Sequence, residues 1–294
     1  MTGITVAWGS PLPSENDFLL QRDGCGWHIP RGPFDRWLRE MASIAGSDVR
    51  SGVAVTGLVR TTNHWNVQTT SGNYKSTWII NAAGRAWGKK YSPCDPMHRM
   101  ITMRLTLAVP ASKRMVRPLV ESAPTGWWFS VESPDRQVHV QFITDLDLLA
   151  NRTPSLADWY ELLEAAPHTA ARLRLAVPIG TPILQSVNTG FSLPKADSRL
   201  VPVGDAVISM DPLASQGICF AVESAQAAAT MILDNLRQDT QAEESYSDWC
   251  RDRLRQYLSD CEWFYSMENR WANIPFWSRH RGSVAAVAGA VDVS

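Results

Sequence analysis

One stretch of the chain constrains the fold more than any other. Residues 199–205 read Arg-Leu-Val-Pro-Val-Gly-Asp, which predicts a buried strand that ends in Gly204-Asp205. A loop over 206–216 follows, and residues 217–236, rich in Ala and other apolar types, predict a long helix. The start of such a helix has free N–H groups and the positive end of the dipole, which suit an anionic or electron-rich ligand. An isolated Gly-Asp would be only a loop cap, but this whole stretch favours a ligand site.

The other predicted elements indicate an α/β protein with two kinds of sheet. Residues 4–8 alternate like a strand, and the apolar residues of 34–45 recur at helical spacing up to Gly46. Short strands at 53–59, 64–69 and 75–80, separated by turn residues, predict an antiparallel meander. A separate strand-rich region covers 100–148, a helix from Thr153-Pro154 to Ala166 is stopped by Pro167, and a second helical stretch covers 244–270.

Composition excludes several classes of protein. Lys and Arg number 28 against 29 Asp and Glu, and this balance argues against a nucleic-acid partner. No apolar run is long enough to span a membrane, and the first residues do not read as a signal peptide. The five scattered cysteines favour neither zinc nor a disulfide framework, which predicts a cytoplasmic location. The six histidines show no metal-ligand spacing, and no side chain stands out as a catalytic acid or base.

Three motifs, in order along the chain, carry a resemblance to a known family. They are Gly-Cys-Gly-Trp-His-Ile-Pro-Arg at 24–31 with Phe-Asp-Arg-Trp-Leu at 34–38, Trp-Ile-Ile-Asn-Ala-Ala-Gly-Arg at 78–85, and the stretch from Val203 to Ile218, which contains Gly-Asp-Ala and Asp-Pro. Together they resemble the FAD-dependent oxidoreductases that include class A aromatic hydroxylases, geranylgeranyl reductases and tryptophan halogenases. The resemblance covers residues 24–236.

The resemblance implies FAD as the cofactor and a set of residues that bind it. Asp205 would hold the ribityl chain or the part of FAD near the pyrophosphate, and the loop from Pro212 to Ile218 would pass the isoalloxazine ring. Backbone N–H groups at the helix start would face the flavin edge that becomes negative on reduction. The predicted cofactor-binding residues are Gly204, Asp205, Pro212, Gly217, Ile218, Gly84, Arg85 and Arg31.

Two aromatic stretches are similar to one branch of this family. The tail from Phe264 to Trp277 and the run Gly126-Trp127-Trp128-Phe129 resemble the halogenases and the related flavoproteins that modify protein tryptophans. We therefore predict Trp127, Trp128 and Phe129 as a substrate wall, although most of the 13 tryptophans are expected in the core. The Trp-x-Trp-x-Ile-Pro motif of tryptophan halogenases is absent, so halogenation is less favoured than hydroxylation or dehydrogenation.

The sequence departs from the family at one important place. The Gly-x-Gly-x-x-Gly turn that cradles the FAD pyrophosphate in the family is not found, because Gly24 and Gly26 are followed by no third glycine at the right place. Three interpretations stay open. The true start lies upstream, the chain is a non-catalytic remnant, or it is one half of a split flavoprotein completed by a partner chain.

The resemblance implies both an architecture and an activity. The expected fold is α/β, with a partial FAD-binding Rossmann-like domain of the glutathione-reductase type at 1–92 and 193–236, an inserted antiparallel substrate domain at 93–192, and a helical C-terminal segment at 237–294. The implied activity is monooxygenation of an aromatic or tryptophan-like substrate, free or peptide-borne, through a flavin hydroperoxide. A flavin reductase is a candidate partner.

Overall fold

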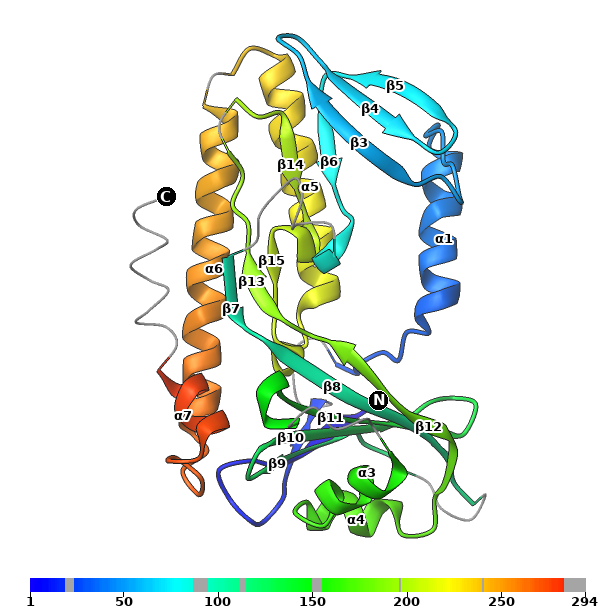
Figure 1. Cartoon of the computed structure of the whole chain (residues 1–294), viewed down its shortest axis with the longest axis vertical. Helices are drawn as coiled ribbons and strands as arrows, with labels where there is room; N and C mark the ends of the chain where they lie inside the picture. The colour runs from blue at the N-terminus through cyan, green and yellow to red at the C-terminus, as the bar shows by residue number, and fades with distance from the viewer. Residues whose placement is uncertain are drawn as a thin grey trace.

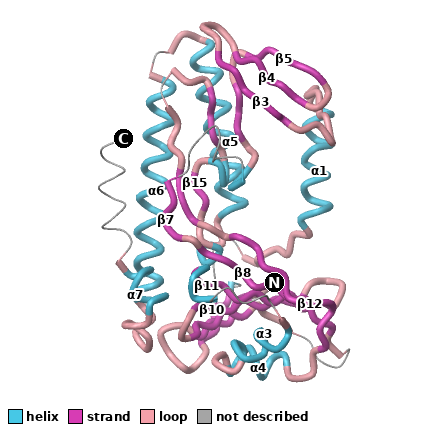
Figure 2. Tube along the Cα trace, viewed as in Figure 1, coloured by secondary structure: helices cyan, strands magenta, loops and turns pink. Residues whose placement is uncertain are grey.

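The computed structural model describes residues 1–18, 24–86, 95–110, 115–149, 155–195, 197–239 and 241–282. A broad sheet forms the lower part of the molecule, two long helices rise along one side, and a smaller sheet and a separate helix stand opposite (Figure 1). Helices and strands contribute comparably to the trace (Figure 2). The expected α/β class is confirmed.

The lower part is a seven-stranded sheet in the order β12-β8-β11-β10-β9-β1-β2. Its strands are β1 (Gly3–Ala7), β2 (Ser14–Asp17), β8 (Met100–Ala108), β9 (Leu119–Ala123), β10 (Gly126–Glu132), β11 (Gln137–Asp145) and β12 (Val177–Ser186). β1 runs parallel to β9, whereas the other pairings are antiparallel. The first two strands, which the sequence assigned to the FAD-binding part, therefore extend the sheet of the expected insert.

Two short helices, α3 (Leu156–Leu163) and α4 (Pro167–Leu173), cover one face of this sheet. The apolar side chains of β8 and β11 pack against Trp159, Leu163 and Leu173 there. Helix α3 ends before Pro167, at Leu163 rather than Ala166, and Pro167 begins α4, a helix that the sequence analysis did not predict, because proline suits the first helical turn. Ser155 caps α3 through Asp158 N, and the expected start at Thr153-Pro154 lies outside the described residues.

The upper part contains a two-stranded parallel sheet of β6 (Ile79–Asn81) and β14 (Leu200–Pro202). Two helices, α5 (Gly217–Leu236) and α6 (Ala242–Ser266), pack together beside it. The predicted bounds of α5 are confirmed, whereas α6 ends at Ser266 rather than at residue 270. A small sheet in the order β15-β13-β7 joins the two parts through β7 (Asp95–His98), β13 (Thr189–Phe191) and β15 (Ile208–Ser209).

The end of α6 and the short helix α7 (Pro275–Arg281) pack on the second face of the large sheet. Tyr265 and Trp277 form a core there with Trp8 and Trp127, and the Trp277 indole donates a hydrogen bond to the Ala123 carbonyl at 3.0 Å. The expected helical tail is thus present and covers one end of this face. No helix among the described residues is long and apolar enough to cross a bilayer.

A third group of elements, formed by residues 31–76, is not buried against the rest of the described chain. Helix α1 (Arg31–Ile44) and the antiparallel sheet β3 (Val55–Arg60), β4 (Trp65–Thr69) and β5 (Gly72–Ser76) correspond to the predicted helix and meander. The strand predicted at 75–80 is wrong in its bounds, because Gly72 already pairs with Thr69 and residues 79–81 belong to β6. None of residues 24–80 is buried, and α1 exposes Trp37, Leu38 and Ile44. Local patterning therefore determines these elements, while their apolar faces remain uncovered by the described chain.

Candidate flavin site

The candidate site lies where the two parallel strands end. Because β6 and β14 pair in parallel, Asn81 opposite Pro202, the chain leaves both strands at the same edge. Each strand is followed by a single helical turn, η2 (Gly84–Ala86) after β6 and η4 (Gly204–Ala206) after β14. Arg85 Nε lies 3.3 Å from Asp205 Oδ2, and Arg85 Nη2 donates to the Met210 carbonyl at 3.0 Å. The structure thus brings together four of the predicted residues, Gly84, Arg85, Gly204 and Asp205.

Gly204 allows α5 to approach the strand end closely. Its φ is +59°, in the left-handed region, and a Cβ there would lie 3.2 Å from the Ala221 Cβ. Its N–H donates to Ser224 Oγ at 2.8 Å. A side chain at position 204 would therefore strain the backbone and push α5 away from the site.

The first turn of α5 opens to solvent. Ser215 has a φ of +52°, and Gln216, the N-cap, makes no side-chain hydrogen bond to the helix. A Cβ placed on Gly217 would meet no atom of the described residues within 4 Å, and Ile218 is exposed. The unsatisfied N–H groups and the positive end of a 20-residue helix therefore face open space beside the loop from Pro212.

A buried carboxyl fixes the start of that loop. Asp211 Oδ1 accepts from Leu213 N at 2.8 Å, and Oδ2 accepts from the Tyr265 hydroxyl at 2.6 Å. The Asp211 N–H donates to the Tyr257 hydroxyl at 2.8 Å. Burial raises the pKa of the Asp211 carboxyl, against the opposing effect of the Tyr265 hydrogen bond. Two tyrosines of α6 therefore hold the loop by its first residue.

Sequence reasoning missed the part these tyrosines play. The sequence analysis placed Tyr257 in the predicted helical stretch 244–270 and Tyr265 in the aromatic tail, with no role in the site. The two residues lie eight positions apart, close to two helical turns, so their side chains share one face of α6. That spacing was visible in the sequence, but their partner at Asp211 depends on tertiary packing.

The hydrogen-bonding and charged groups at the strand ends match those that a flavin nucleotide requires. Asn81 Nδ2 is buried and has no hydrogen-bond partner among the described residues, so one donor at the end of β6 is unsatisfied. Gly84, like Gly217, has no atom of the described residues within 4 Å of where its Cβ would lie, which leaves room for a ligand against this backbone. A cationic guanidinium, free helix N–H groups and a carboxylate that accepts hydroxyl hydrogen bonds match the phosphate, the pyrimidine edge and the ribityl chain of such a group.

Arg31 is not part of this cluster in the structure. It lies at the start of α1, where its guanidinium forms an exposed ion pair with Asp35 at 3.3 Å. Helix α1 stands apart from α5 and β14 (Figure 1). A role for Arg31 in cofactor binding remains a prediction.

The predicted substrate wall is divided between the two faces of the large sheet. Trp128 is fully buried against Phe142 and Trp159 on the face that α3 and α4 cover. Trp127 and Phe129 lie on the opposite face, Trp127 buried beneath the tail helices and Phe129 half-buried. Strand alternation therefore excludes one continuous wall made of all three residues, and a substrate role for Trp127 and Phe129 remains a prediction.

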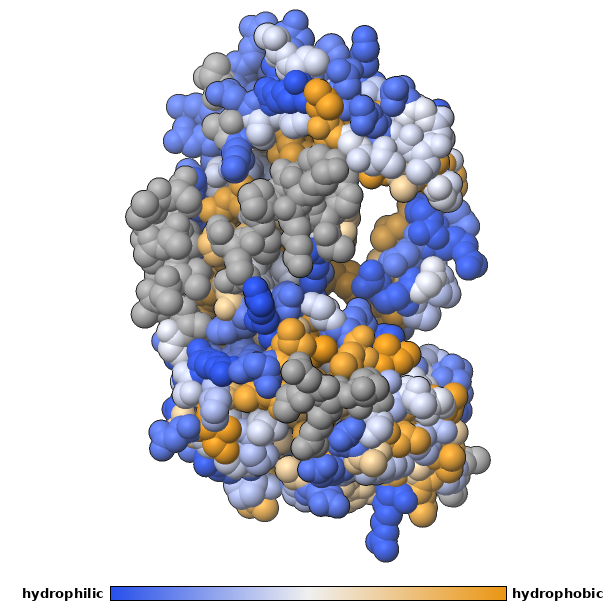
Figure 3. All heavy atoms as spheres, in the orientation of Figure 1, coloured by the Kyte–Doolittle hydropathy of each residue, from blue (hydrophilic) through white to orange (hydrophobic). Residues whose placement is uncertain are grey.

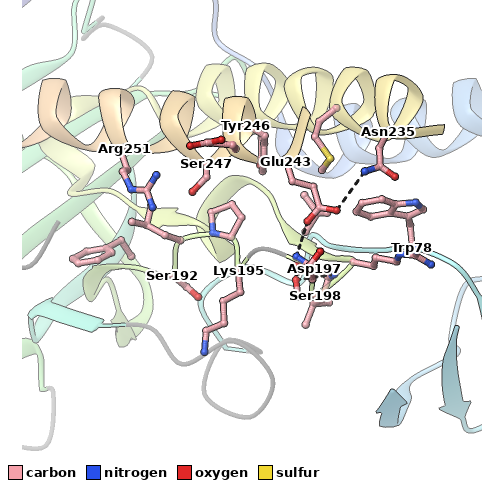
Figure 4. A pocket seen from close by; sticks show the side chains of 18 residues that line it. Trp78, Ser192, Lys195, Asp197, Ser198, Asn235, Glu243, Tyr246, Ser247 and Arg251 are labelled. Atoms are coloured by element: carbon pink, nitrogen blue, oxygen red, sulfur yellow. Dashed lines mark hydrogen bonds between the residues drawn. The ribbon is translucent and has the colours of Figure 1, made fainter. Parts of the chain in front are cut away.

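A large hollow lies away from this cluster. It encloses about 930 Å³ between residues 191–201 and the helices α5 and α6, with Trp78, Lys195 and Arg251 in its wall (Figure 4). Within it, Glu243 accepts from Asp197 N at 2.8 Å and from Asn235 at 3.4 Å. It contains none of the predicted site residues.

Comparison with known proteins defines the class of this fold. The chain has the fold of flavin-dependent halogenases and monooxygenases, and it is homologous to an FAD-dependent oxidoreductase, so the resemblance seen in the sequence is confirmed. No protein-family model matches the chain.

Three particular proteins illustrate the likeness. The putative FAD-dependent oxidoreductase LodB of Marinomonas mediterranea is 22% identical over 289 residues, which cover 94% of this chain and 77% of LodB. The flavin-dependent halogenase CmlS superposes with a TM-score of 0.79 at 20% identity, covering 95% of this chain and 55% of CmlS. The peptidyl tryptophan dihydroxylase QhpG superposes with a TM-score of 0.68 at 21% identity, covering 96% of this chain and 64% of QhpG. The chain thus spans little more than half the length of CmlS.

Proposed function

We propose that the chain binds FAD at the carboxyl ends of β6 and β14 and acts as a flavin-dependent monooxygenase on an aromatic substrate. The observation that carries this proposal is the open, uncapped start of α5 beside the Arg85–Asp205 pair. QhpG, named as acting on peptidyl tryptophan, supports an aromatic substrate that is free or peptide-borne. The proposal includes a separate flavin reductase as electron source and a cytoplasmic location.

Each type of group at this site would contact a different part of FAD. Asp205 would accept hydrogen bonds from ribityl hydroxyls, while Arg85, held by Asp205 and the Met210 carbonyl, would face a phosphate. The N–H groups at Gly217 and Ile218 would stabilise negative charge at the edge of the ring. FAD, when bound, supplies the redox chemistry, and this chain supplies binding, orientation and electrostatics.

The test uses the open space at Gly217. Gly217→Val adds a side chain whose Cβ has no described atom within 4 Å and which extends into the approach of a ligand to the helix start. We expect the dissociation constant for FAD, followed by calorimetry and by the visible absorption spectrum, to rise at least tenfold. Ala229→Val, on an exposed part of the same helix, is the matched control and should leave FAD binding unchanged. Equal FAD affinity in both variants would contradict the placement of the flavin.

A second candidate function is one half of a split flavoprotein. It is favoured by the uncovered apolar faces of residues 24–80, where Ile44 is 77% and Trp37 51% exposed. In addition, β6 pairs on only one edge within the described chain, although parallel strands are normally covered on both faces and paired. A strand and helix from a partner chain would cover these surfaces together.

Hydrogen exchange and sedimentation of the chain alone test this second function. The split-protein hypothesis expects rapid amide exchange throughout 24–80 together with self-association of the lone chain. A monomeric chain with slowly exchanging amides in α1 and β3–β5 would contradict it, because those elements would then be stably packed without a partner.

A further inference from the structure

The hydroxyl of Tyr265 has a buried base as its hydrogen-bond partner. It donates to Asp211 Oδ2 at 2.6 Å, and both side chains are buried. By comparison, the hydroxyl of Tyr246, which is also buried on α6, donates to the Pro202 carbonyl at 2.8 Å. A backbone carbonyl accepts a hydrogen bond but does not take up the proton. Tyr265 therefore has a proton acceptor in contact with its phenol, and Tyr246 does not.

This arrangement is what the oxidation of a phenol requires. A phenol that loses an electron becomes a strong acid, so it is oxidised readily only when its proton can leave at the same time. Burial raises the pKa of the Asp211 carboxyl, which makes its ionised form a stronger base, although the Tyr265 hydrogen bond opposes this effect. Burial also raises the pKa of Tyr265, so the phenol keeps its proton until it is oxidised.

Two tryptophans contact the Tyr265 ring. The Tyr265 centroid lies 5.9 Å from that of Trp8 and 5.9 Å from that of Trp277, and the two indole centroids are 5.1 Å apart. Electrons pass efficiently between rings in contact, because the overlap of their π orbitals falls steeply with distance. Trp277 is buried, whereas Trp8 is only half-buried. The ring contacts therefore lead from the Asp211 carboxyl to the surface at Trp8.

The neighbouring charges favour Trp8 over Trp271 as the outer end of this series. Trp271 contacts Trp277 at 6.0 Å, but the Arg270 guanidinium lies 4.3 Å from the centre of the Trp271 ring and disfavours a second positive charge there. The Trp8 indole N–H instead donates to the Phe264 carbonyl at 2.8 Å, which stabilises positive charge on that ring. Hydrophilic atoms predominate over α7 in Figure 3, so a polar surface covers this aromatic core.

We propose that Trp8, Tyr265 and Asp211 form an electron-transfer route from the surface to a one-electron oxidant at the loop that Asp211 begins. This statement rests on the proposed function, because the oxidant is the bound oxidised flavin after it absorbs blue light. Tyr265 gives one electron to that oxidant and its hydroxyl proton to Asp211. Trp8 then gives one electron to the Tyr265 radical, and the proton returns from Asp211 to the phenol oxygen. A reductant in solution, here ascorbate, restores Trp8, so the net change is one electron moved from ascorbate to the flavin.

Transient absorption after a blue flash tests this route in protein saturated with FAD. Tyrosyl and tryptophan radicals absorb at different wavelengths, so the two steps can be followed separately. We expect a tyrosyl signal followed by a tryptophan signal, and ascorbate should shorten the lifetime of the second. Tyr265→Phe should lower the yield of the tryptophan signal at least fivefold. Tyr246→Phe, the matched substitution of a buried tyrosine on the same helix, should leave both signals unchanged.

Two further measurements separate proton acceptance from a structural role. Asp211→Asn keeps the size of the side chain but removes the base, so it should abolish the tyrosyl signal while the circular dichroism spectrum stays the same. In heavy water the tyrosyl signal of the unsubstituted protein should form more slowly, because a proton moves together with the electron. Trp8→Phe should remove the effect of ascorbate, whereas Trp159→Phe, on the other face of the sheet, should retain it.

Three results would each overturn the proposal. They are equal signals in Tyr265→Phe and the unsubstituted protein, a tyrosyl signal that persists in Asp211→Asn, and an unchanged effect of ascorbate in Trp8→Phe.

A flavin-free measurement keeps this test separate from the proposed function. Failure of the chain to bind FAD would contradict the proposed function, and the protein side of the route is then tested with azide radicals, which oxidise tryptophans. Transfer of the radical to tyrosine that is lost in both Tyr265→Phe and Asp211→Asn would support the route. Absence of such transfer, or its persistence in either variant, would overturn it.

Discussion

Tryptophans in two regions of this chain have opposite surroundings. In the lower sheet, Trp128 and Trp159 are completely buried and meet edge to face, with ring centroids 5.3 Å apart. In the segment 24–80, Trp27 and Trp37 are 85% and 51% exposed. Both regions form the elements that their sequence patterns predict. The difference teaches that periodicity determines a helix or strand, while burial depends on which other surfaces the chain supplies.

The largest expected difference between the two regions is in the effect on stability of replacing one tryptophan in each with alanine. Trp159→Ala should lower the free energy of unfolding by about 3–5 kcal/mol, because it empties a closed core between α3 and the sheet. Trp37→Ala, which removes an exposed ring from α1, should change it by no more than about 0.5 kcal/mol. Urea unfolding followed by circular dichroism measures both.

Similar losses in the two variants would show that α1 is packed in solution. The contrast between the regions would then be wrong, and so would the argument for a partner chain. Trp128→Phe is a useful intermediate, since it keeps an aromatic ring in the same core and should cost less than Trp159→Ala.

The pH dependence of stability tests whether the junction between the large sheet and the tail is packed. His98 stacks on His280, with ring centroids 4.2 Å apart, and burial lowers the pKa of His98 from 6.5 to about 4. His280 and Arg279 lower this pKa as well, while Asp145 opposes them. The unfolded chain therefore binds a proton between pH 6.5 and 4 that the folded chain does not, and stability is lost as the pH falls through this window.

From pH 7 to pH 5 this histidine should cost about 2 kcal/mol of unfolding free energy. His98→Gln should remove that part of the pH dependence, as measured by urea unfolding at several pH values. His28→Gln, which changes an exposed histidine, is the control. If the stability of His98→Gln depends on pH in the same way as that of the unsubstituted protein, the junction between sheet and tail is open to water.

A smaller effect is expected where the tail holds the candidate flavin loop. Tyr265→Phe removes the hydroxyl that donates to the buried Asp211 carboxyl at 2.6 Å, and it should cost on the order of 1 kcal/mol. Tyr160→Phe changes a tyrosine that is 43% exposed and should have almost no effect. If thermal unfolding shows the same small change for both, the Asp211 carboxyl is satisfied in another way and α6 does not anchor the loop.

Much of the fold follows from local sequence pattern. The strand from Leu200 and the helix from Gly217 form close to where the pattern predicts them, because each combines a clear period with its own turn residues. The third strand of the meander was predicted at 75–80, but the chain divides that run between β5 and β6. The helix that Pro167 begins was missed because proline is typical both of a helix start and of a helix end. The pairing of β1 with β9 joins residues more than 110 positions apart, and no local signal encodes it.

The candidate site was predictable in part for the same reason. Gly204, Asp205 and Gly217 belong to one continuous motif, and the parallel pairing of β6 brings Gly84 and Arg85 to it. The Asp211–Tyr265 contact depends on how distant elements pack. Strand alternation also divides Trp127 from Trp128, although the two are neighbours in sequence.

Hydrogen exchange with and without FAD tests the central claim, that the open start of α5 and the strand ends form a flavin site. The account predicts that saturating FAD slows exchange of the amides at 84–86 and 217–219, while the slow amides of β8–β11 remain unchanged. Exchange at 217–219 that stays fast when the absorption spectrum shows bound FAD, or an absorption spectrum identical to that of free FAD, would contradict it.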